Sequence, residues 1–474
     1  MRIALDRRHA LVALFTLAAL SLGLFAPSTL NDGDTWWHVK VGEWILTHGQ
    51  APSVDLWSAT RTGQPWTAHE WLSEAIMALA WRAGGWAGVV AVCAAAFGSA
   101  IWILGQTVAR RLEGTALAVV LLLGMSLMTP SLLARPHMLA FPLVALWAAE
   151  LVRSREEGRT PSLWLAPVMM LWANLHGGWA FGLALAGPFG LEALFTAEPA
   201  KRLSVFLRWA VFGIVCLGAA ALTPFGIEGV LLPFHLLGVK NLAGIGEWRP
   251  ASFGQIEPLE VVLLVLIGFA MTRPLKLAPA MTALLVILIH LSLSQGRHQM
   301  LLGMVGPMIL AGPIAAALGG AGEVGLKSRL TLMVTAFVGL ALVGLRLVTP
   351  LPRTDSPVSP ISALAAVPPE VRSRPVLNQY GFGGYLIWSD IKPFIDSRAE
   401  IFKDEGLGQY AELADGDARV LDAVLDGQKI GWTIFAPEER VNAMLDARPG
   451  WKRVYADRFA VVHVRQQGVT TSRP

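Results

Sequence analysis

Long apolar runs separated by short polar segments dominate the first 350 residues of the chain. A helix needs about 20 apolar residues to cross the hydrocarbon core of a bilayer. Windows that meet or approach this length occur at residues 10–28, 86–109, 115–133, 137–152, 161–175, 177–196, 205–223, 258–272, 277–294, 299–319 and 329–349. The pattern therefore predicts a polytopic α-helical membrane domain over 1–350 with about eleven spans, of which 161–175 and 258–272 are notably short.

Two long connections break the alternation of spans and short loops. Residues 29–85 contain "VGEWILTHG" and "WLSEAIMALAWRAGG", which have apolar residues at helical spacing and aromatic residues suited to the membrane surface. We expect both segments to form interfacial helices in a first outer loop, and the connection 224–257 to contain a similar helix.

The pattern changes after Pro350. Residues 351–360, "LPRTDSPVSP", are typical of a linker, and 361–474 have the mixed pattern of a soluble α/β domain. We predict strands at "PVLNQY", "GGYLIW", "PFID", "WTIFA" and "FAVVHV", a helical stretch near 404–427, and a turn at "GFGG".

Composition and charge agree with a membrane protein. The chain is 54% hydrophobic and 15% charged, whereas a soluble domain carries about 25% charged residues. The basic residues are dispersed, which argues against a nucleic-acid partner. They follow the positive-inside rule if the N-terminus is cytoplasmic and the first apolar run is an uncleaved anchor. This topology predicts a cytoplasmic (inner) membrane protein whose C-terminal domain is extracytoplasmic.

The same topology sends the polar, histidine-containing motifs to the outer face. The motif "NDGDTWWH" directly follows the first span and supplies Asp34, our candidate general base. Candidates for a second acid or base in the same loop are Asp32, His38, His69 and Glu70. Later outer loops supply candidate phosphate- or substrate-binding residues, namely Arg135, His137, His176, Arg249, Arg297 and His298.

Each candidate also has a structural interpretation. Asp32 and Asp34 suit helix capping, and Trp36 and Trp37 suit membrane-surface anchors. Glu70 and His69 suit the first turn of a helix, and the arginines suit span ends that reach lipid headgroups. Asp396, Arg398 and Glu400 in the tail are expected to form a surface or interdomain salt-bridge network.

Several motifs together resemble the GT-C superfamily of membrane glycosyltransferases. They are "DTWWH", "HEWL", "RPHM", "NLHGG", "GRH" and the tail "GGYLIW…FIDSR", and they are similar to those of a bacterial multi-span group whose members mostly lack an assigned reaction. The resemblance implies a catalytic acid shortly after the first span, at the position of Asp34, and a polyprenyl-phosphate-linked sugar donor.

The chain departs from one branch of that superfamily. Where the aminoarabinose and mannosyl transferases have adjacent Asp and Glu followed by Tyr, this chain has Asp34, Thr35 and His38, which puts the substrates of that branch in doubt. Asp32 is then an alternative second carboxylate. The oligosaccharyltransferase branch uses a divalent metal, and the sequence leaves a metal requirement open.

These observations predict an inverting glycosyltransferase that passes a sugar from a polyprenyl-phosphate donor to an envelope glycan, lipid or protein at the outer face. Two alternatives from other classes remain: a transporter or flippase of a lipid-linked substrate, and a non-catalytic protein of envelope assembly.

Overall fold

The computed structural model describes residues 7–238, 248–320 and 329–466. The chain divides into two compact units. The first comprises Met1–Thr29, Ala80–Pro233 and Ile245–Pro350, and the second comprises Leu30–Leu79, Phe234–Gly244 and Leu351–Pro474. The end of the first unit at Pro350 coincides with the start of the expected linker. The second unit combines most of the expected first outer loop with the C-terminal region.

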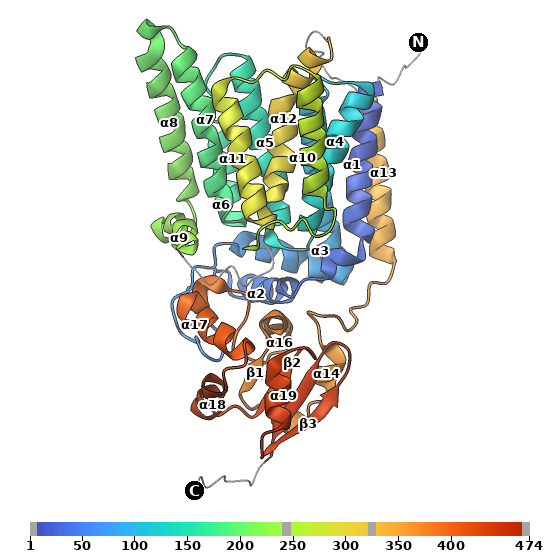
Figure 1. Ribbon diagram of the computed structural model, residues 1–474, viewed down its shortest axis with the longest axis vertical. Coiled ribbons are helices and arrows are strands. Elements are labelled where there is room, and N and C mark those ends of the chain that lie inside the picture. The colour runs from blue at the N-terminus through green and yellow to red at the C-terminus, as the bar shows by residue number, and fades with distance from the viewer. Residues whose placement is uncertain (1–6, 239–247, 321–328, 467–474) are drawn as a thin grey trace. The chain divides into compact units, whose positions relative to one another are not determined.

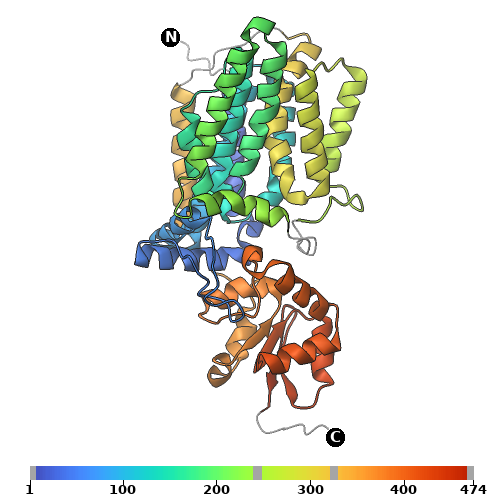
Figure 2. The ribbon, with the colours of Figure 1, turned by 90° about the vertical axis from the view of Figure 1, so that its left-hand side faces the viewer.

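The first unit is a bundle of helices that run nearly parallel to one another in two perpendicular views (Figures 1 and 2). Its helices are α1 (Arg7–Phe25), α3 (Trp71–Val108, which begins in the second unit), α4 (Gly114–Met128), α5 (Pro136–Glu156), α6 (Leu165–Leu175), α7 (Trp179–Thr196), α8 (Arg202–Ala220), α10 (Pro258–Thr272), α11 (Pro279–Ser294), α12 (Gln299–Ala317) and α13 (Arg329–Val348). In the bundle interior, Trp147 of α5 stacks on Phe212 of α8 with ring centroids 5.6 Å apart.

Every predicted span overlaps one of these helices. Seven helical segments in the described residues are long and apolar enough to cross a membrane, namely α1, α3, α4 with the turn that follows it, α7, α8, α12 and α13. The windows 137–152, 161–175, 258–272 and 277–294 correspond to α5, α6, α10 and α11, which do not meet both criteria. The helices are confirmed, and the number of spans stays a prediction.

Helix α3 is interrupted at two consecutive glycines. Gly84 has φ −152° and ψ 21°, and Gly85 has φ 58° and ψ −147°, a conformation that a side chain would disfavour. The break separates the predicted interfacial segment 71–85 from the predicted span 86–109. Helix α2 (Asp34–His48) covers the other predicted segment, and α9 (Ile227–Leu237) lies in the connection 224–257, of which 239–247 are outside the described residues.

A four-stranded sheet forms the centre of the second unit, in the order β1-β2-β4-β3. Strand β1 (Val376–Asn378) pairs in parallel with β2 (Trp432–Phe435), and β4 (Val461–Arg465) pairs antiparallel with both β2 and β3 (Trp451–Ala456). The accompanying helices are α14 (Ile361–Ala366), α15 (Pro369–Arg372), α16 (Gly383–Trp388), α17 (Ala399–Ala414), α18 (Ala418–Gly427) and α19 (Arg440–Asp446). All four residues of β2 are buried, so β2 lies in the core of the unit.

Three of the five predicted strands are confirmed, at "PVLNQY", "WTIFA" and "FAVVHV", as are helices near 404–427. The strand predicted at "GGYLIW" is wrong, because these residues form α16. Five of its six residues are buried, so the segment lacks the alternation of apolar and polar residues that distinguishes a helix from a strand. The strand at "PFID" is also wrong. The side chain of Asn378 bonds this segment instead, accepting from the Phe394 N–H at 2.8 Å and donating to the Ile395 carbonyl at 2.9 Å.

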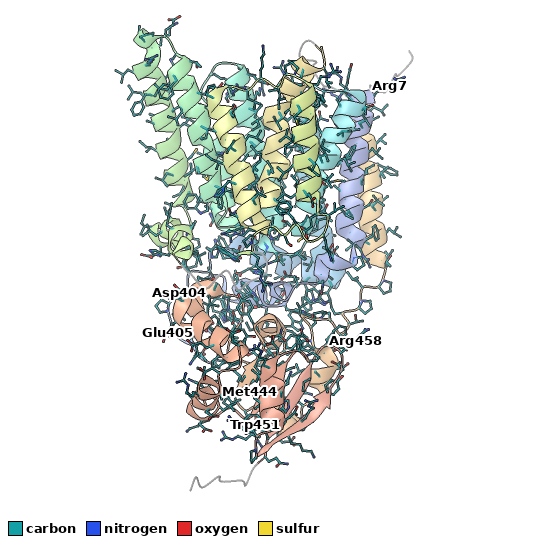
Figure 3. The ribbon with its side chains drawn as sticks, viewed as in Figure 1. Arg7, Asp404, Glu405, Met444, Trp451 and Arg458 are labelled. Atoms are coloured by element: carbon teal, nitrogen blue, oxygen red, sulfur yellow. The ribbon has the colours of Figure 1, made fainter. Side chains whose placement is uncertain are left out.

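Strand β3 and helix α19 were not predicted. In β3 the middle residues, from Lys452 to Val454, are exposed, so the strand lacks the apolar alternation by which strands are recognised. Trp451 begins this edge strand, and Arg458 lies in the turn before β4 (Figure 3).

Helices α2 and α16 approach each other backbone to backbone within the second unit. A Cβ atom added to Gly384 would lie 2.0 Å from the carbonyl oxygen of Gly33, and one added to Gly33 would lie 2.6 Å from the carbonyl oxygen of Gly381. The glycines of "GFGG" therefore allow the close packing that fixes Gly33, the residue directly before α2 and Asp34.

We predict that Gly384→Ala destabilises the protein, because the new methyl group would collide with backbone that cannot move aside. An overpacked site typically costs about 1–3 kcal/mol, which should lower the apparent melting temperature in detergent. Gly381→Ala is the matched control in the same motif, since nothing lies within 4 Å of its added Cβ. Equal melting temperatures for the two variants would contradict the close approach.

Candidate functional site

The structure separates the roles of Asp32 and Asp34. The Asp32 Oδ1 atom accepts a hydrogen bond from the Asp34 backbone N–H at 2.7 Å, so Asp32 satisfies a free donor at the start of α2. Asp34 is the first residue of α2 and its side chain is buried, with 8% exposure. Asp32 therefore forms a turn before α2, whose cap residue is Gly33, and α2 itself positions the Asp34 carboxylate.

Arg353, which the sequence did not single out, accompanies Asp32. Its guanidinium lies over the ring of Trp36 at 4.3 Å and donates to the Ser359 hydroxyl at 3.3 Å. Burial lowers the pKa of Arg353 to about 10, and the Asp32 carboxylate acts against this shift. Asp32 therefore has a second structural role, as a countercharge.

Trp36 and Trp37 are core residues, and the prediction that they are membrane-surface anchors is wrong. Their exposures are 3% and 5%. The Trp36 indole donates to the Ser359 hydroxyl at 2.7 Å, and the Trp37 indole donates to the Ser397 hydroxyl at 2.9 Å. Both therefore hold α2 to the C-terminal region, because buried indole N–H groups require partners.

His38, one turn after Asp34 in α2, lies between the carboxyl groups of Glu70, the residue before α3, and Glu74, in the first turn of α3. Its Nδ1 atom is 3.2 Å from Glu74 Oε1, and its Nε2 atom is 3.9 Å from Glu70 Oε2. His38 and Glu74 are each 1% exposed. His69 Nε2 lies 3.9 Å from the other Glu70 oxygen. The structure thus brings His38, His69 and Glu70 together and adds Glu74.

The surroundings of Glu74 favour the neutral form of its carboxyl group. Burial raises the pKa of Glu74 well above its usual value, the negative charges of Glu70 and Glu400 raise it further, and Arg398 opposes them. A carboxyl group that keeps its proton can donate to the His38 ring nitrogen. His38 Nε2 faces Glu70, and a hydrogen bond from Glu74 to Nδ1 would leave the ring proton on Nε2.

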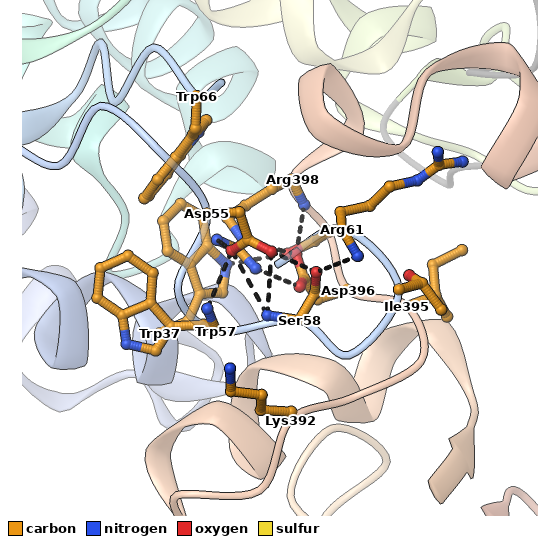
Figure 4. Close-up of polar contacts among 12 residues, drawn as sticks. Trp37, Asp55, Trp57, Ser58, Arg61, Trp66, Lys392, Ile395, Asp396 and Arg398 are labelled. Carbon is orange, nitrogen blue, oxygen red and sulfur yellow. Dashed lines mark hydrogen bonds and ion pairs between the residues drawn. The ribbon is translucent and has the colours of Figure 1, made fainter. Parts of the chain in front are cut away.

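A buried arginine lies in the same unit (Figure 4). Arg398 donates through Nη2 to Asp396 Oδ2 at 2.6 Å and through Nη1 to Asp55 Oδ1 at 2.8 Å, and all three side chains have 0% exposure. Its guanidinium lies 4.9 Å from the Trp66 ring. The expected salt-bridge network therefore exists, but it is buried and not at the surface.

The two charges of the Asp55–Arg398 pair stabilise each other. Burial alone would raise the pKa of Asp55, but Arg398 and hydrogen bonds from Ser58 and the Trp57 backbone leave it below its usual value. Burial alone would lower the pKa of Arg398, but Asp396 and Asp55 raise it overall. Glu400, the third tail residue, accepts from the Trp66 indole at 2.9 Å.

The remaining candidates lie in the first unit, in two groups. Arg135 is the residue before α5, and His137 in its first turn bonds the Ser131 carbonyl through Nε2 at 2.8 Å. The ring of His137 lies 6.2 Å from that of His176, whose Nδ1 accepts from the Gly178 N–H at 3.0 Å. Arg135, His137 and His176 are half-buried.

The second group joins the ends of two connections. The Arg249 carbonyl accepts from the Gly296 N–H at 3.1 Å, which brings the loop of Arg249 beside Arg297 and His298. The Arg297 guanidinium lies 3.2 Å from the Trp248 ring centroid, and the buried His298 ring lies 5.0 Å from that of Phe181. Arg249 is exposed.

No group of three or more His, Cys, Asp or Glu side chains that could hold a metal ion occurs within residues 7–238, 248–320 and 329–466.

Sequence reasoning missed Glu74, Asp55 and Arg353. Glu74 follows Glu70 at helical spacing, so the pair could have been placed on one face of the helix. Asp55 and Arg353 offer no such signal, because their partners lie far away in the chain.

Comparison with solved structures reveals shared architecture. The chain is similar to the oligosaccharyltransferase AglB from Archaeoglobus fulgidus in complex with an inhibitory peptide and a dolichol-phosphate, with a TM-score of 0.57, 10% identity, and coverage of 90% of this chain and 69% of that chain. It is also similar to ArnT from Cupriavidus metallidurans in the apo state, with a TM-score of 0.50, 15% identity and coverage of 96% and 97%. No protein-family model and no curated protein sequence matches the chain.

These likenesses establish the fold. The chain is a multi-pass membrane protein that shares the fold of AglB and ArnT, and it has a small C-terminal α/β region.

We predict that Glu74→Gln changes the pH dependence of stability. A raised carboxyl pKa means that the folded state binds more protons than the unfolded state, so wild-type stability falls as pH rises above the unfolded value of about 4.3. The amide of the variant does not titrate, so the melting temperature of Glu74→Gln should fall less than that of the wild type as pH rises above this value. Glu412→Gln, at an exposed position of α17, is the control, and parallel curves for wild type and Glu74→Gln would contradict the assignment.

We also predict that Arg398→Met severely destabilises the protein, because it leaves two buried carboxylates without their cation. Breaking a buried ion pair typically costs about 3–5 kcal/mol, which denaturant titration in detergent would measure. The triple variant D55N/D396N/R398M should recover part of the loss. Arg419→Gln, at a side chain with 93% exposure, should change nothing measurable, and a similar loss in this control would refute the prediction.

Proposed function

We propose that this protein is an inverting glycosyltransferase that transfers a sugar from a polyprenyl-phosphate donor to an envelope glycan, lipid or protein acceptor at the outer face of the cytoplasmic membrane. Its GT-C-like fold supports membrane-bound chemistry on a lipid-linked substrate. The AglB structure, which shares this fold, holds a dolichol-phosphate and a peptide.

The observation that carries the proposal is the placement of Asp34. Its buried carboxylate stands on the first residue of α2, nine residues after α1 ends at Phe25, and Asp32 accepts a hydrogen bond from the Asp34 backbone N–H. The close contact of Gly33 with the α16 region and the two tryptophan hydrogen bonds fix the helix that carries it. The Asp34 carboxylate is held in a fixed position, and Asp32, not Asp34, accepts the hydrogen bond from the helix backbone. Such a carboxylate suits general-base catalysis.

In the proposed reaction, Asp34 accepts a proton from the acceptor nucleophile as that nucleophile attacks the anomeric carbon of the donor. The bond between this carbon and the phosphate oxygen breaks, and the electron pair leaves with the polyprenyl phosphate. Attack from the face opposite the leaving group inverts the anomeric configuration. The proton stays on Asp34 until solvent or the released phosphate takes it.

The leaving phosphate requires positive charge, because its negative charge grows as the bond breaks. We assign this role to arginines among Arg135, Arg249 and Arg297, with His137, His176 and His298 as further hydrogen-bonding groups toward the donor. Arginine suits the role because its planar fork binds two phosphate oxygens at once.

His38 and its carboxyl neighbours distinguish this chain from the branch with tyrosine at that position. We assign Glu70 and His69 to the binding of the acceptor, since both are only half-buried, and Glu74 to the orientation of His38.

We predict that Asp34→Asn abolishes transfer while the protein still inserts into the membrane. Loss of a general base typically lowers the rate by about 10²–10⁴-fold. The measurement is mass spectrometry of envelope glycans in a deletion strain complemented with wild type or variant, with the amount of membrane-inserted protein equalised by immunoblot.

Asp32→Asn is the matched control. An asparagine oxygen can still accept from the Asp34 N–H. Loss of the countercharge to Arg353 should lower stability, for which the equalised protein amounts correct, so this variant should keep most of the activity. Full glycan formation by Asp34→Asn would overturn the proposal, and equal loss in both variants would show that the motif acts through folding.

A further inference from the structure

A cavity of about 680 Å³ opens at one end of the helix bundle in the first unit, and none of the candidate site residues lines it. The ends of α3 and α5, the start of α6 and the second half of α12 line it. This volume lies within the range of about 300–1,000 Å³ that is typical of small-molecule sites.

One wall of the cavity is charged. Four arginines (Arg110, Arg111, Arg153 and Arg159) and three glutamates (Glu150, Glu156 and Glu157) line it, so positive charge is in excess. Arg111 Nη2 lies 3.1 Å from Glu156 Oε1, and Arg159 Nη1 lies 2.8 Å from Glu150 Oε1. These side chains are 20–36% exposed, and partly exposed pairs of this kind contribute little stability, so an anion can rearrange them at small cost.

The other wall is apolar. Leu165, Val168, Met308 and Ala311 line it, and Leu146 is 42% exposed beside them. Trp164 also lines the cavity, and its side chain is 84% exposed. Exposure of so large an apolar side chain to bulk water is unfavourable. Tryptophan is favoured where the bilayer meets water, so this part of the cavity has the character of a membrane interface.

We propose that this cavity binds an anionic phospholipid, with its phosphate on the arginines of the charged wall and its glycerol and first acyl carbons on the apolar wall. The shared chemistry is phosphate recognition by guanidinium groups. The apolar wall selects a lipid over free phosphate, and the excess positive charge selects an anionic headgroup over a zwitterionic one. Basic pockets between membrane helices bind anionic headgroups in this way.

The site is separate from the proposed transfer reaction and does not depend on it. None of its lining residues belongs to the candidate site around Asp34 or to the two arginine and histidine groups. Its proposed role is to hold the bundle end in the membrane by a bound lipid, so the expected effect is on stability and lipid affinity.

The test uses the full-length protein, purified in dodecyl maltoside and titrated with phosphatidylglycerol, phosphatidylcholine or inorganic phosphate. Melting temperature and native mass spectrometry are the readouts. We expect phosphatidylglycerol to bind and to raise the melting temperature, phosphatidylcholine to do so more weakly, and inorganic phosphate to have no effect. Equal effects of the two lipids, or an equal effect of inorganic phosphate, would overturn the proposal.

Two variants locate the binding. Arg110→Gln should weaken phosphatidylglycerol binding about fivefold, the contribution of one arginine near a lipid surface, and Val168→Trp should block the apolar wall without changing charge. The matched control is Arg202→Gln, at an exposed arginine that starts α8 and does not line the cavity. Wild-type affinity in both cavity variants, or the same loss in the control, would refute the site.

Discussion

One guanidinium group, fully removed from solvent, connects two parts of the chain that lie 343 residues apart. Arg398 binds Asp55 of the first long connection and Asp396 of the C-terminal region. Buried charges are tolerated only when each has an oppositely charged partner, since burying an isolated ion costs roughly several kcal/mol of folding free energy. Asp55 has its cation only in the C-terminal region, whereas Arg398 has Asp396 beside it, so the first connection depends on the C-terminal region for its partner.

The same cation influences the proposed reaction centre through electrostatics. Arg398 lowers the pKa of Glu74, whereas burial, Glu70 and Glu400 raise it. The net effect is a raised pKa for Glu74, whose carboxyl group contacts His38, one turn along α2 from Asp34. The charge state of this interior is thus a property of the whole unit, and a substitution at Arg398 would alter His38 as well as stability.

The sequence predicted the parts of the fold that depend on local pattern. Apolar windows located the bundle helices, because the bilayer requires long apolar runs whatever their neighbours are. The polar motifs "NDGDTWWH" and "HEWL" made Asp34, His38 and Glu70 candidates, because polar residues close to a span are conspicuous. The pattern failed where a partner far away in the chain determines the structure. Trp36 and Trp37 have the sequence features of surface anchors, but Ser359 and Ser397 accept their indole hydrogen bonds in the core. The segment "PFID" has the composition of a strand, but the Asn378 side chain bonds its backbone. The spacing of Glu74 from Glu70 marks only a shared helix face, and the burial of Glu74 beside His38 depends on the packing of α2.

The distance between Asp55 and Arg398 also sets an order of assembly. Ribosomes add about 5–20 residues per second, so the 343 residues that separate the two side chains correspond to a delay of roughly 20–70 s. During that interval the first connection has no cation for Asp55 and no serine for either indole, and α2 lacks the α16 backbone against which Gly33 packs. Completion of the second unit is therefore a late, post-insertion event, and the proposed base reaches its final position only after nearly the whole chain has been made.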